Sequence, residues 1–234
     1  MTAAAPAGRV RAVFLDFGGT LVSGSPDPYD AWRPVFQRRG LPIDRARWDA
    51  ANDRALAEVA SLQYEYLGRR PTFWDVVHAG TLRQLGVPDP DGALVAELHD
   101  VATSPEARPP FPETEEVLDA LSARGLTLHV LSNNTDYLAE TLARRGWTRR
   151  FASVTFSQEA GAEKPDARVF TFALRRAGYP PHEVLHVGDS WTADYDGARR
   201  AGLRAAWLSR DGRAAPEPTV TIRDLRGIAP LLDA

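Results

Sequence analysis

Residues 10–17 read VRAVFLDF, and Gly18 and Gly19 follow directly. The run is nearly continuous in apolar residues and contains β-branched and aromatic side chains. Short apolar runs of this kind, closed by glycine, are typical of strands buried on both faces of a parallel sheet. The sequence therefore predicts a buried parallel strand with Asp16 at its end.

The same kind of run recurs further along the chain, at residues 126–131, 151–156, 184–187 and 203–208. Stretches with helical periodicity lie beside these runs, at residues 114–124, 135–145, 166–177 and 191–201. Strands that alternate with helices of about ten residues predict right-handed βαβ units and a parallel sheet with helices on both faces. We therefore expect an α/β, Rossmann-like fold with its active site at the carboxyl ends of the strands.

The alternation is interrupted once, after the first strand. Residues 22–110 show helical periodicity and many aromatic side chains, without a convincing strand. Turn-rich segments border this stretch at residues 23–26 and 108–112, as expected for a pair of hinges. We therefore expect a core domain of residues 1–21 and 111–234, with an α-helical cap domain of residues 22–110 inserted into it.

The composition of the chain excludes several classes of function. A net charge of -3 does not favour a polyanion, so no nucleic-acid partner is expected. The chain has no cysteine, which excludes disulfides, thiolate metal sites and cysteine nucleophiles. Residues 1–8 lack the apolar stretch of a signal peptide, and no apolar run is long enough to span a membrane. We expect a soluble cytoplasmic protein without a membrane partner.

Lysine occurs once in the chain. Of the 28 basic residues, all are arginine except Lys164. A compact ammonium on a flexible stem can reach a small anion in a crowded site, whereas the planar guanidinium presents a two-donor face. We interpret Lys164 as a functional residue; the alternative is a lysine retained by chance on a solvated turn.

Four polar motifs stand where predicted strands end or predicted helices start. They are residues 16–21 (DFGGTL), Ser132-Asn133, Lys164-Pro165 and residues 188–194 (GDSWTAD). A single aspartate at a strand end is more often a cap or a turn former than a catalytic group. The four motifs together, in this order, predict one polar site.

This set of motifs resembles the haloacid dehalogenase superfamily, and the resemblance covers nearly the whole chain, including an insert at the position of the family's cap. The resemblance implies that Asp16 is the nucleophile and that Lys164 steadies both Asp16 and the transferred phosphoryl group. It implies that Ser132 binds a phosphate oxygen. Thr20 and Asn133 match the positions that flank the first two motifs, which we assign to substrate binding.

The resemblance also implies a Mg²⁺ site formed by Asp16, the Gly18 carbonyl, Asp189 and Asp194, the last through water. Hard oxygen ligands suit magnesium, which keeps several of its waters. A carboxylate can attack phosphorus only if the repulsion between two anions is reduced, and Mg²⁺ with Lys164 would reduce it. We expect a Mg²⁺-dependent phosphatase, monomeric or homodimeric, that acts on a small phosphorylated metabolite through an aspartyl-phosphate.

Gly18 departs from the family pattern. Phosphatases of the superfamily usually carry a second aspartate there, as general acid and base, and such proton transfer contributes about 10²–10⁴-fold. The glycine leaves three possibilities for proton transfer. The acid comes from the insert (Tyr29, Asp27 or His78), the substrates have good leaving groups that need little acid, or the enzyme is a weak catalyst.

Two other branches of the superfamily also lack the second aspartate. Phosphonoacetaldehyde hydrolase-like enzymes need a lysine in the cap, and the insert has none, which excludes that branch. Haloacid dehalogenases carry a tyrosine six residues after the motif lysine and a small neutral residue in place of the metal-binding aspartate. Here these positions hold Phe170 and Asp189. A catalytically weak binding or regulatory protein is the alternative from another class.

The insert is expected to set specificity. Arg33, Arg69 and Arg70 are candidates to meet a second anionic group, and aromatic side chains to stack on a ring are Tyr64, Tyr66 and Trp74. The simpler interpretation is solvated arginines and core aromatics. For the strand histidines His129 and His186 we expect core packing.

Overall fold

The structure is a computed structural model that describes residues 8–24 and 27–232. Residues 1–7, which carry most of the segment examined for a signal peptide, lie outside the described residues, as do Ser25 and Pro26 at the first turn-rich border. Contacts divide the chain into two compact units. The sheet unit comprises Met1–Gly24, Pro109–Asn134 and Gly146–Ala234, and the helical unit comprises Ser25–Arg108 and Thr135–Arg145.

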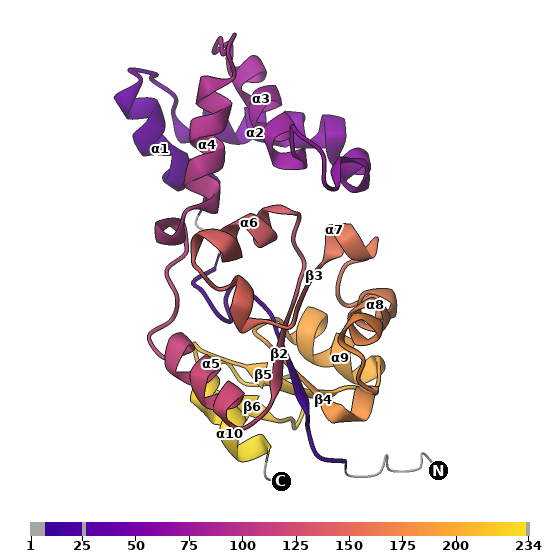
Figure 1. Cartoon of the computed structure of the whole chain (residues 1–234). Coiled ribbons are helices and arrows are strands. Elements are labelled where there is room, and N and C mark those ends of the chain that lie inside the picture. The colour runs from indigo at the N-terminus through magenta and orange to yellow at the C-terminus, as the bar shows by residue number, and fades with distance from the viewer. Residues whose placement is uncertain (1–7, 25–26, 233–234) are drawn as a thin grey trace. The chain divides into compact units, whose positions relative to one another are not determined.

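A parallel six-stranded sheet forms the centre of the sheet unit among the described residues, in the order β3-β2-β1-β4-β5-β6 (Figure 1). The strands are β1 (Ala12–Leu15), β2 (Thr127–Ser132), β3 (Ser153–Phe156), β4 (Val184–Gly188), β5 (Arg204–Leu208) and β6 (Thr221–Ile222). The expected α/β class and the five predicted strands are confirmed. The edge strand β6 was not predicted, because two residues are too few to show a pattern.

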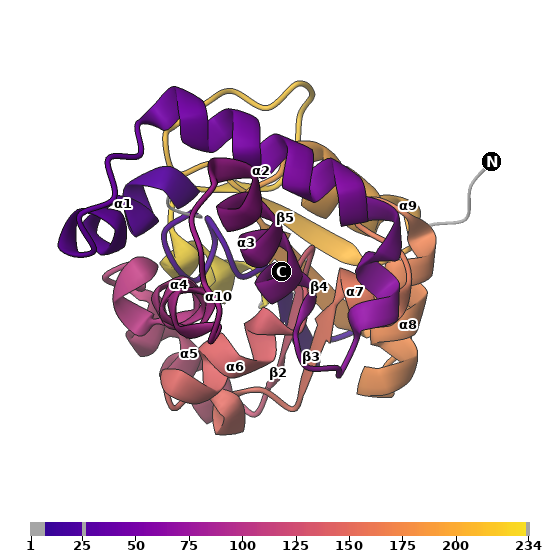
Figure 2. The same cartoon turned by 90° about the horizontal axis from the view of Figure 1, so that it is seen from above.

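Helices cover both faces of this sheet, which explains why β1 is apolar at every position. In both views α8 (Ala167–Ala177) and α9 (Gly197–Arg200) lie on one side, and α5 (Thr114–Ala123) and α10 (Ile228–Leu231) lie on the other (Figure 1 and Figure 2). Successive side chains of β1 point to opposite faces of the sheet. Ala12 and Phe14 belong to the same buried cluster as Val169 and Phe170 of α8.

The predicted helix over residues 191–201 begins differently from expectation. Residues Trp191–Asp196 form a π-helical turn before α9. Its wider spacing shows in the backbone bond from Tyr195 to the Ser190 carbonyl, five residues back, at 3.3 Å. Such turns are frequent at functional sites, and this one contains Asp194. The other three predicted helices are confirmed as α5, α6 (Tyr137–Arg144) and α8, and α7 (Ser157–Ala160) is additional.

The helical unit has its own core. Its helices are α1 (Pro28–Arg38), α2 (Arg45–Val59), α3 (Phe73–Leu85), α4 (Ala93–Thr103) and, by its contacts, α6. Trp32, Phe36 and Trp48 lie at its centre with Leu82 and Leu98. Short 3₁₀ helices occur in both units. Those of the helical unit are Ala60–Tyr66 and Pro105–Ala107, and those of the sheet unit are Thr148–Arg150, Pro181–Glu183 and Leu225–Gly227.

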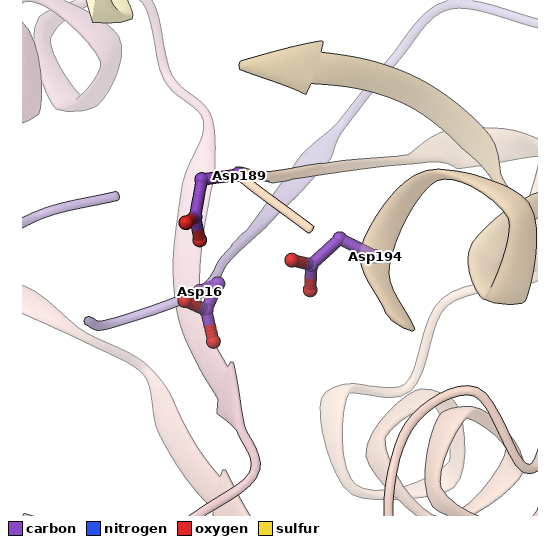
Figure 3. Close-up of side chains that lie close together, drawn as sticks. All are labelled: Asp16, Asp189 and Asp194. Atoms are coloured by element: carbon purple, nitrogen blue, oxygen red, sulfur yellow. The ribbon is translucent and has the colours of Figure 1, made fainter. Parts of the chain in front are cut away.

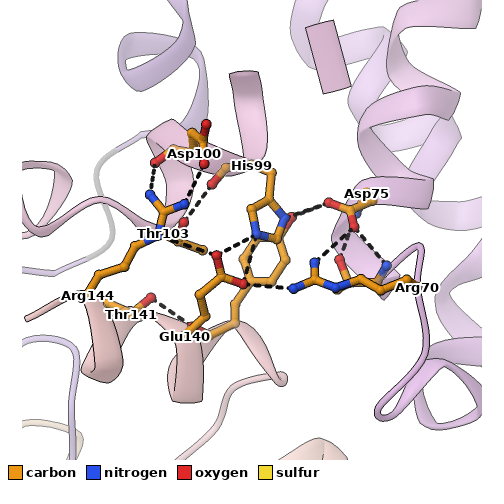
Figure 4. Close-up of polar contacts among 10 residues, drawn as sticks. Arg70, Asp75, His99, Asp100, Thr103, Glu140, Thr141 and Arg144 are labelled. Atoms are coloured by element: carbon orange, nitrogen blue, oxygen red, sulfur yellow. Dashed lines mark hydrogen bonds and ion pairs between the residues drawn. The ribbon is translucent and has the colours of Figure 1, made fainter. Parts of the chain in front are cut away.

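A buried histidine explains why α6 groups with the helical unit, although the sequence division placed residues 135–145 with the sheet (Figure 4). His99 of α4 contacts Asp75 of α3 through Nδ1 at 2.7 Å and Glu140 of α6 through Nε2 at 3.0 Å. Tyr137 of α6 also donates to Asp75, at 3.0 Å. Because each ring nitrogen faces a carboxylate, both carry protons. The Asp75 contact, with help from Glu140, raises the pKa of His99 although burial opposes the charge.

Within residues 8–24 and 27–232, the structure has no helix that combines the length and the apolar character needed to cross a membrane.

Replacing His99 with glutamine is expected to remove a pH-dependent part of the stability. Since folding raises the pKa of His99, its charged contacts stabilise the fold fully below about pH 6.5, the unfolded value, and are lost as pH rises through the folded value. The melting temperature of the wild type should exceed that of His99→Gln by more at about pH 6 than at about pH 9.

His129→Gln is the control of opposite sign: burial lowers the pKa of His129 to about 4, so the folded ring is neutral at both pH values while the unfolded ring is largely protonated at about pH 6. The wild type should therefore compare less favourably with His129→Gln at about pH 6 than at about pH 9. A wild-type advantage over His99→Gln that stays constant across the range would contradict the assignment of an imidazolium.

Candidate active site

The strand order places three of the predicted motifs at one edge of the sheet. β1 lies between β2 and β4, with Leu15 level with Val130 and Val187. Asp16 follows β1, Ser132 ends β2 and Asp189 follows β4, so their backbones leave the sheet side by side. In open parallel sheets, the point where the strand order reverses at the carboxyl ends is where ligands bind.

Lys164 occupies the centre of this edge. Its side chain is 2% exposed, and its ammonium donates to Asp16 Oδ1 at 2.7 Å, to Asp194 Oδ1 at 2.5 Å and to the Leu131 carbonyl at 2.9 Å. All three ammonium protons therefore have acceptors. The lone lysine of the chain is thus a buried partner of two acidic residues rather than a residue on a solvated turn.

Asp194 is fixed by contacts from several directions. His186 of β4 contacts its Oδ1 at 2.9 Å, and the Ser190 amide donates to its Oδ2 at 3.0 Å. Because a carboxylate only accepts, we assign the His186 proton to Nε2. His186 is fully buried, as the expectation of core packing requires, but it also orients Asp194. This second role was missed, because the periodicity of a strand does not show what its side chain reaches.

Three carboxylates converge on one point (Figure 3). Asp16, Asp189 and Asp194 each offer an oxygen, and these oxygens lie within 4.8 Å of one another. Thr20, which is buried, donates to Asp189 Oδ1 at 3.5 Å, the limit of a hydrogen bond. Burial, together with the charges of Asp16 and Asp194, raises the pKa of Asp189 to about 6.

The charges of the site are balanced unevenly. Burial acts against the charged form of Asp194, but Lys164 and His186 outweigh it and hold its pKa well below the usual range. Burial also opposes the ammonium of Lys164, yet the two carboxylates raise its pKa, so it stays protonated. For Asp16, burial prevails and raises the pKa despite Lys164. Asp16 and Asp189 therefore lack sufficient positive charge nearby, and a cation between them would relieve their repulsion.

The remaining predicted residues take distinct positions. Asn133 binds the backbone of Lys164 twice: its Nδ2 donates to the Lys164 carbonyl at 2.9 Å, and its Oδ1 accepts from the Lys164 amide at 2.7 Å. One amide proton of Asn133 stays available to a ligand. Ser132 is buried at the end of β2. Gly18 is partly buried and pairs with Val22 in an isolated bridge.

Two glycines are required by the close approach of carboxylates. A Cβ on Gly188 would lie 2.2 Å from Asp194 Cγ, and a Cβ on Gly19 would lie 2.4 Å from Asp189 Oδ2. Gly19 also has a φ of 78°, which favours glycine. Gly18 differs: its φ is not positive, and within the described part of the chain a Cβ there would meet nothing within 4 Å.

The insert residues considered as acids have structural roles in the helical unit. Asp27 caps α1 and pairs with Arg45 at 2.6 Å. Tyr29 donates its hydroxyl proton to the Ile43 carbonyl at 3.1 Å. His78 is 1% exposed, and burial lowers its pKa to about 3, so it is neutral. These contacts argue against each of the three as the missing acid.

The insert residues considered for specificity divide into two groups. Arg69 and Arg70 line a pocket of about 270 Å³ in the helical unit, together with Thr72, Asp136, Tyr137, Glu140 and neighbouring small residues. Arg70 also contacts Glu140 at 3.1 Å. Arg33 and Tyr64 are exposed, whereas Tyr66 and Trp74 are half-buried. The aromatic residues at the core of the unit are others, among them Trp32 and Trp48.

Comparison with known proteins identifies the class that this fold and site define. The family of haloacid dehalogenase-like hydrolases matches residues 10–202. The haloacid dehalogenase-like hydrolase domain-containing protein 3 of Danio rerio is 30% identical over 212 residues, 87% of this chain and 87% of that protein. The chain therefore belongs to the haloacid dehalogenase-like hydrolase family and is a hydrolase.

Two further relatives bear on the chemistry. A phosphoserine phosphatase of Thermus thermophilus is 40% identical over 124 residues, and this match spans 51% of our chain and only 50% of that protein. The crystal structure of a 2-haloacid dehalogenase from Pseudomonas syringae pv. Tomato DC3000 is similar with a TM-score of 0.75 and 26% identity. It covers 96% of this chain and 98% of that one. The family thus includes relatives named for both reactions.

Replacing Gly188 with alanine is expected to destabilise the protein by about 1–3 kcal/mol, because the added methyl group overlaps the Asp194 carboxylate. Gly18→Ala should change the free energy of unfolding by less than about 0.5 kcal/mol, since the space beside it is open. Urea unfolding of the two variants checks this contrast; equal losses would contradict the tight packing at Gly188.

Proposed function

We propose that this chain is a Mg²⁺-dependent phosphatase that hydrolyses a small phosphorylated metabolite through an aspartyl-phosphate on Asp16. The observation that carries the proposal is the placement of Lys164, buried between Asp16 and Asp194 at 2.7 Å and 2.5 Å. The relative named phosphoserine phosphatase supports a phosphorylated substrate. A monomeric or homodimeric, cytoplasmic enzyme belongs to the same proposal.

The donor set fits magnesium. Asp16 and Asp189 offer carboxylate oxygens whose charges are incompletely balanced, and the Gly18 carbonyl would add a third hard oxygen. Both oxygens of Asp194 already accept hydrogen bonds, which suits a contact to the metal through water. When bound, the ion would supply Lewis-acid charge stabilisation at the transferred phosphoryl group.

The residues of the chain supply the nucleophile and its surroundings. Asp16 attacks phosphorus with one carboxylate oxygen; the bond from phosphorus to the ester oxygen breaks, and the leaving oxygen takes up a proton from water, because Gly18 has no acid to donate one. Water then attacks the phosphorus of the acyl-phosphate, which releases inorganic phosphate and restores the carboxylate. Lys164 holds the Asp16 side chain and opposes its charge, so that it can approach an anion. Ser132, with the remaining proton of Asn133, is proposed to hold the phosphate oxygens. Thr20 has one hydroxyl proton, which it donates to Asp189 in this structure, so in this proposal it binds phosphate only when it releases Asp189.

A dehalogenase is the second candidate, favoured by Gly18 and by the 26% identity to a solved 2-haloacid dehalogenase. The residue six positions after Lys164 argues against it, because Phe170 is fully buried against His186 and has no hydroxyl group. Asp189 also keeps its carboxylate at the point where that branch has a neutral residue. Halide release from 2-chloropropionate, without phosphatase activity, would establish this alternative.

Asp16→Asn is expected to lower Mg²⁺-dependent hydrolysis of p-nitrophenyl phosphate by roughly 10³-fold or more, because the amide cannot form the acyl-phosphate. The far-ultraviolet circular dichroism of the variant should match that of the wild type. Asp166→Asn is the control: Asp166 is a partly exposed N-cap of α8, where asparagine serves equally well. An Asp16→Asn variant with wild-type turnover would remove this mechanism, and a wild type that lacks all turnover would favour a binding protein.

Gly18→Asp is expected to raise kcat/KM on alkyl phosphates about tenfold or more, because the new carboxyl group can protonate a poor leaving group. The φ angle of Gly18 is not positive, and among the described residues a Cβ there would have no neighbour within 4 Å, so the substitution begins without backbone strain or overlap. Gly18→Asn adds the same volume without an acid and should give no increase. Activities on an alkyl phosphate and on p-nitrophenyl phosphate are compared for all three proteins; equal behaviour of the aspartate and asparagine variants would show that proton transfer at this position is not limiting.

A further inference from the structure

Arg210 follows β5, a strand that carries none of the four motifs, yet its guanidinium reaches the loop after Asp16. Its Nε donates to the Gly19 carbonyl at 3.1 Å, and its Nη2 donates to the Thr20 carbonyl at 2.7 Å. Its Nη1 donates to Glu113 Oε1 at 2.7 Å. All three nitrogens of the fork are therefore engaged, in a geometry that a lysine ammonium does not reproduce.

The contacts of Arg210 are largely buried and are supported by an aromatic ring. Its side chain is 19% exposed, and the Glu113 side chain is 5% exposed. The guanidinium carbon lies 3.5 Å from the centre of the Phe111 ring, so the planar head stacks on an aromatic face. Burial opposes the charge of Glu113, but Arg210 holds the pKa of Glu113 below its usual range. The ion pair is therefore charged and largely shielded from solvent.

The two carbonyls belong to the turn that meets Asp189. The turn is closed by bonds from the Gly19 amide to the Val22 carbonyl and from the Leu21 amide to the Phe17 carbonyl, at 2.8 Å and 2.9 Å. On its other side Thr20 donates to Asp189, and the backbone at Gly19 leaves no room for a Cβ beside that carboxylate. A displacement of this turn would therefore displace Asp189 or remove its support.

The same guanidinium also touches the segment that returns from the helical unit. Phe111 donates its amide to the Leu21 carbonyl at 3.2 Å, and Ser23 donates its amide to the Pro109 carbonyl at 2.9 Å. Arg210 stacks on Phe111 and holds Thr20, so it binds both segments where they run next to each other in the sheet unit.

We infer that Arg210 is a positioning residue: it locks the turn at Gly19 and Thr20 against the returning segment at Phe111 and thereby fixes Asp189. Its influence on a bound Mg²⁺ rests on the proposed function, whereas its hold on the turn does not.

Hydrogen exchange of the metal-free protein tests the hold on the turn. In Arg210→Lys, the amides of residues 17–22 are expected to exchange about tenfold faster than in the wild type, with β3 unchanged. Lysine keeps the charge opposite Glu113, so the melting temperature should stay closer to the wild type than that of Arg210→Gln. Full protection of the turn in Arg210→Lys would overturn the inference, because a charge alone would then be sufficient.

Magnesium titration calorimetry gives a second readout. The dissociation constant for Mg²⁺ is expected to rise about tenfold in Arg210→Lys, through Asp189. Arg213→Gln, which changes an exposed arginine that pairs with the nearby Asp211, should leave exchange and Mg²⁺ affinity unchanged. An unchanged Mg²⁺ affinity in Arg210→Lys would overturn the proposed link to Asp189. A wild type that binds no Mg²⁺ would refute the proposed function, and the exchange of residues 17–22 would still decide the role of Arg210.

Discussion

A buried ammonium between two carboxylates is the constraint on which the rest of the sheet unit's site depends. Removing charges from water is costly, and the attraction between them compensates only if the geometry is good and the remaining donors and acceptors are satisfied. Lys164 meets this condition with three acceptors. Asn133 holds its backbone, His186 and the Ser190 amide hold Asp194, and Gly188 leaves space for that carboxylate. Each of these contacts involves only a few atoms, and together they hold the ion cluster of Asp16, Lys164 and Asp194 in place.

Much of this arrangement could be predicted from the sequence, because its main elements have strong local signatures. Apolar runs such as residues 10–17 identify the central strands, and parallel strands bring their carboxyl ends to one edge. The π-helical turn at Trp191–Asp196 could not be predicted, since periodicity over so few residues does not distinguish it from an α-helix. The sequence indicated only a core position for His186, because its contact with Asp194 depends on the π-helical turn that holds Asp194.

Arg210 and α6 show a different limit of prediction. The chain has 28 basic residues, 27 of them arginine, so an arginine that grips two carbonyls cannot be distinguished in sequence from one that faces solvent. Likewise α6 was recognised as a helix from its pattern, but its association with α3 and α4 follows from His99, which bridges Asp75 and Glu140. In both cases the decisive contact joins residues that are far apart in the chain.

The burial of Lys164 has a practical consequence for chemical labelling. Reagents that acylate amines need an accessible, unprotonated nitrogen, and the only lysine nitrogen of this chain is hidden and held in its charged form by two carboxylates. Acylation of the lysine side chain therefore requires that the ion cluster opens. Acylated Lys164, detected by mass spectrometry, would therefore report the opening of this cluster without any engineered probe.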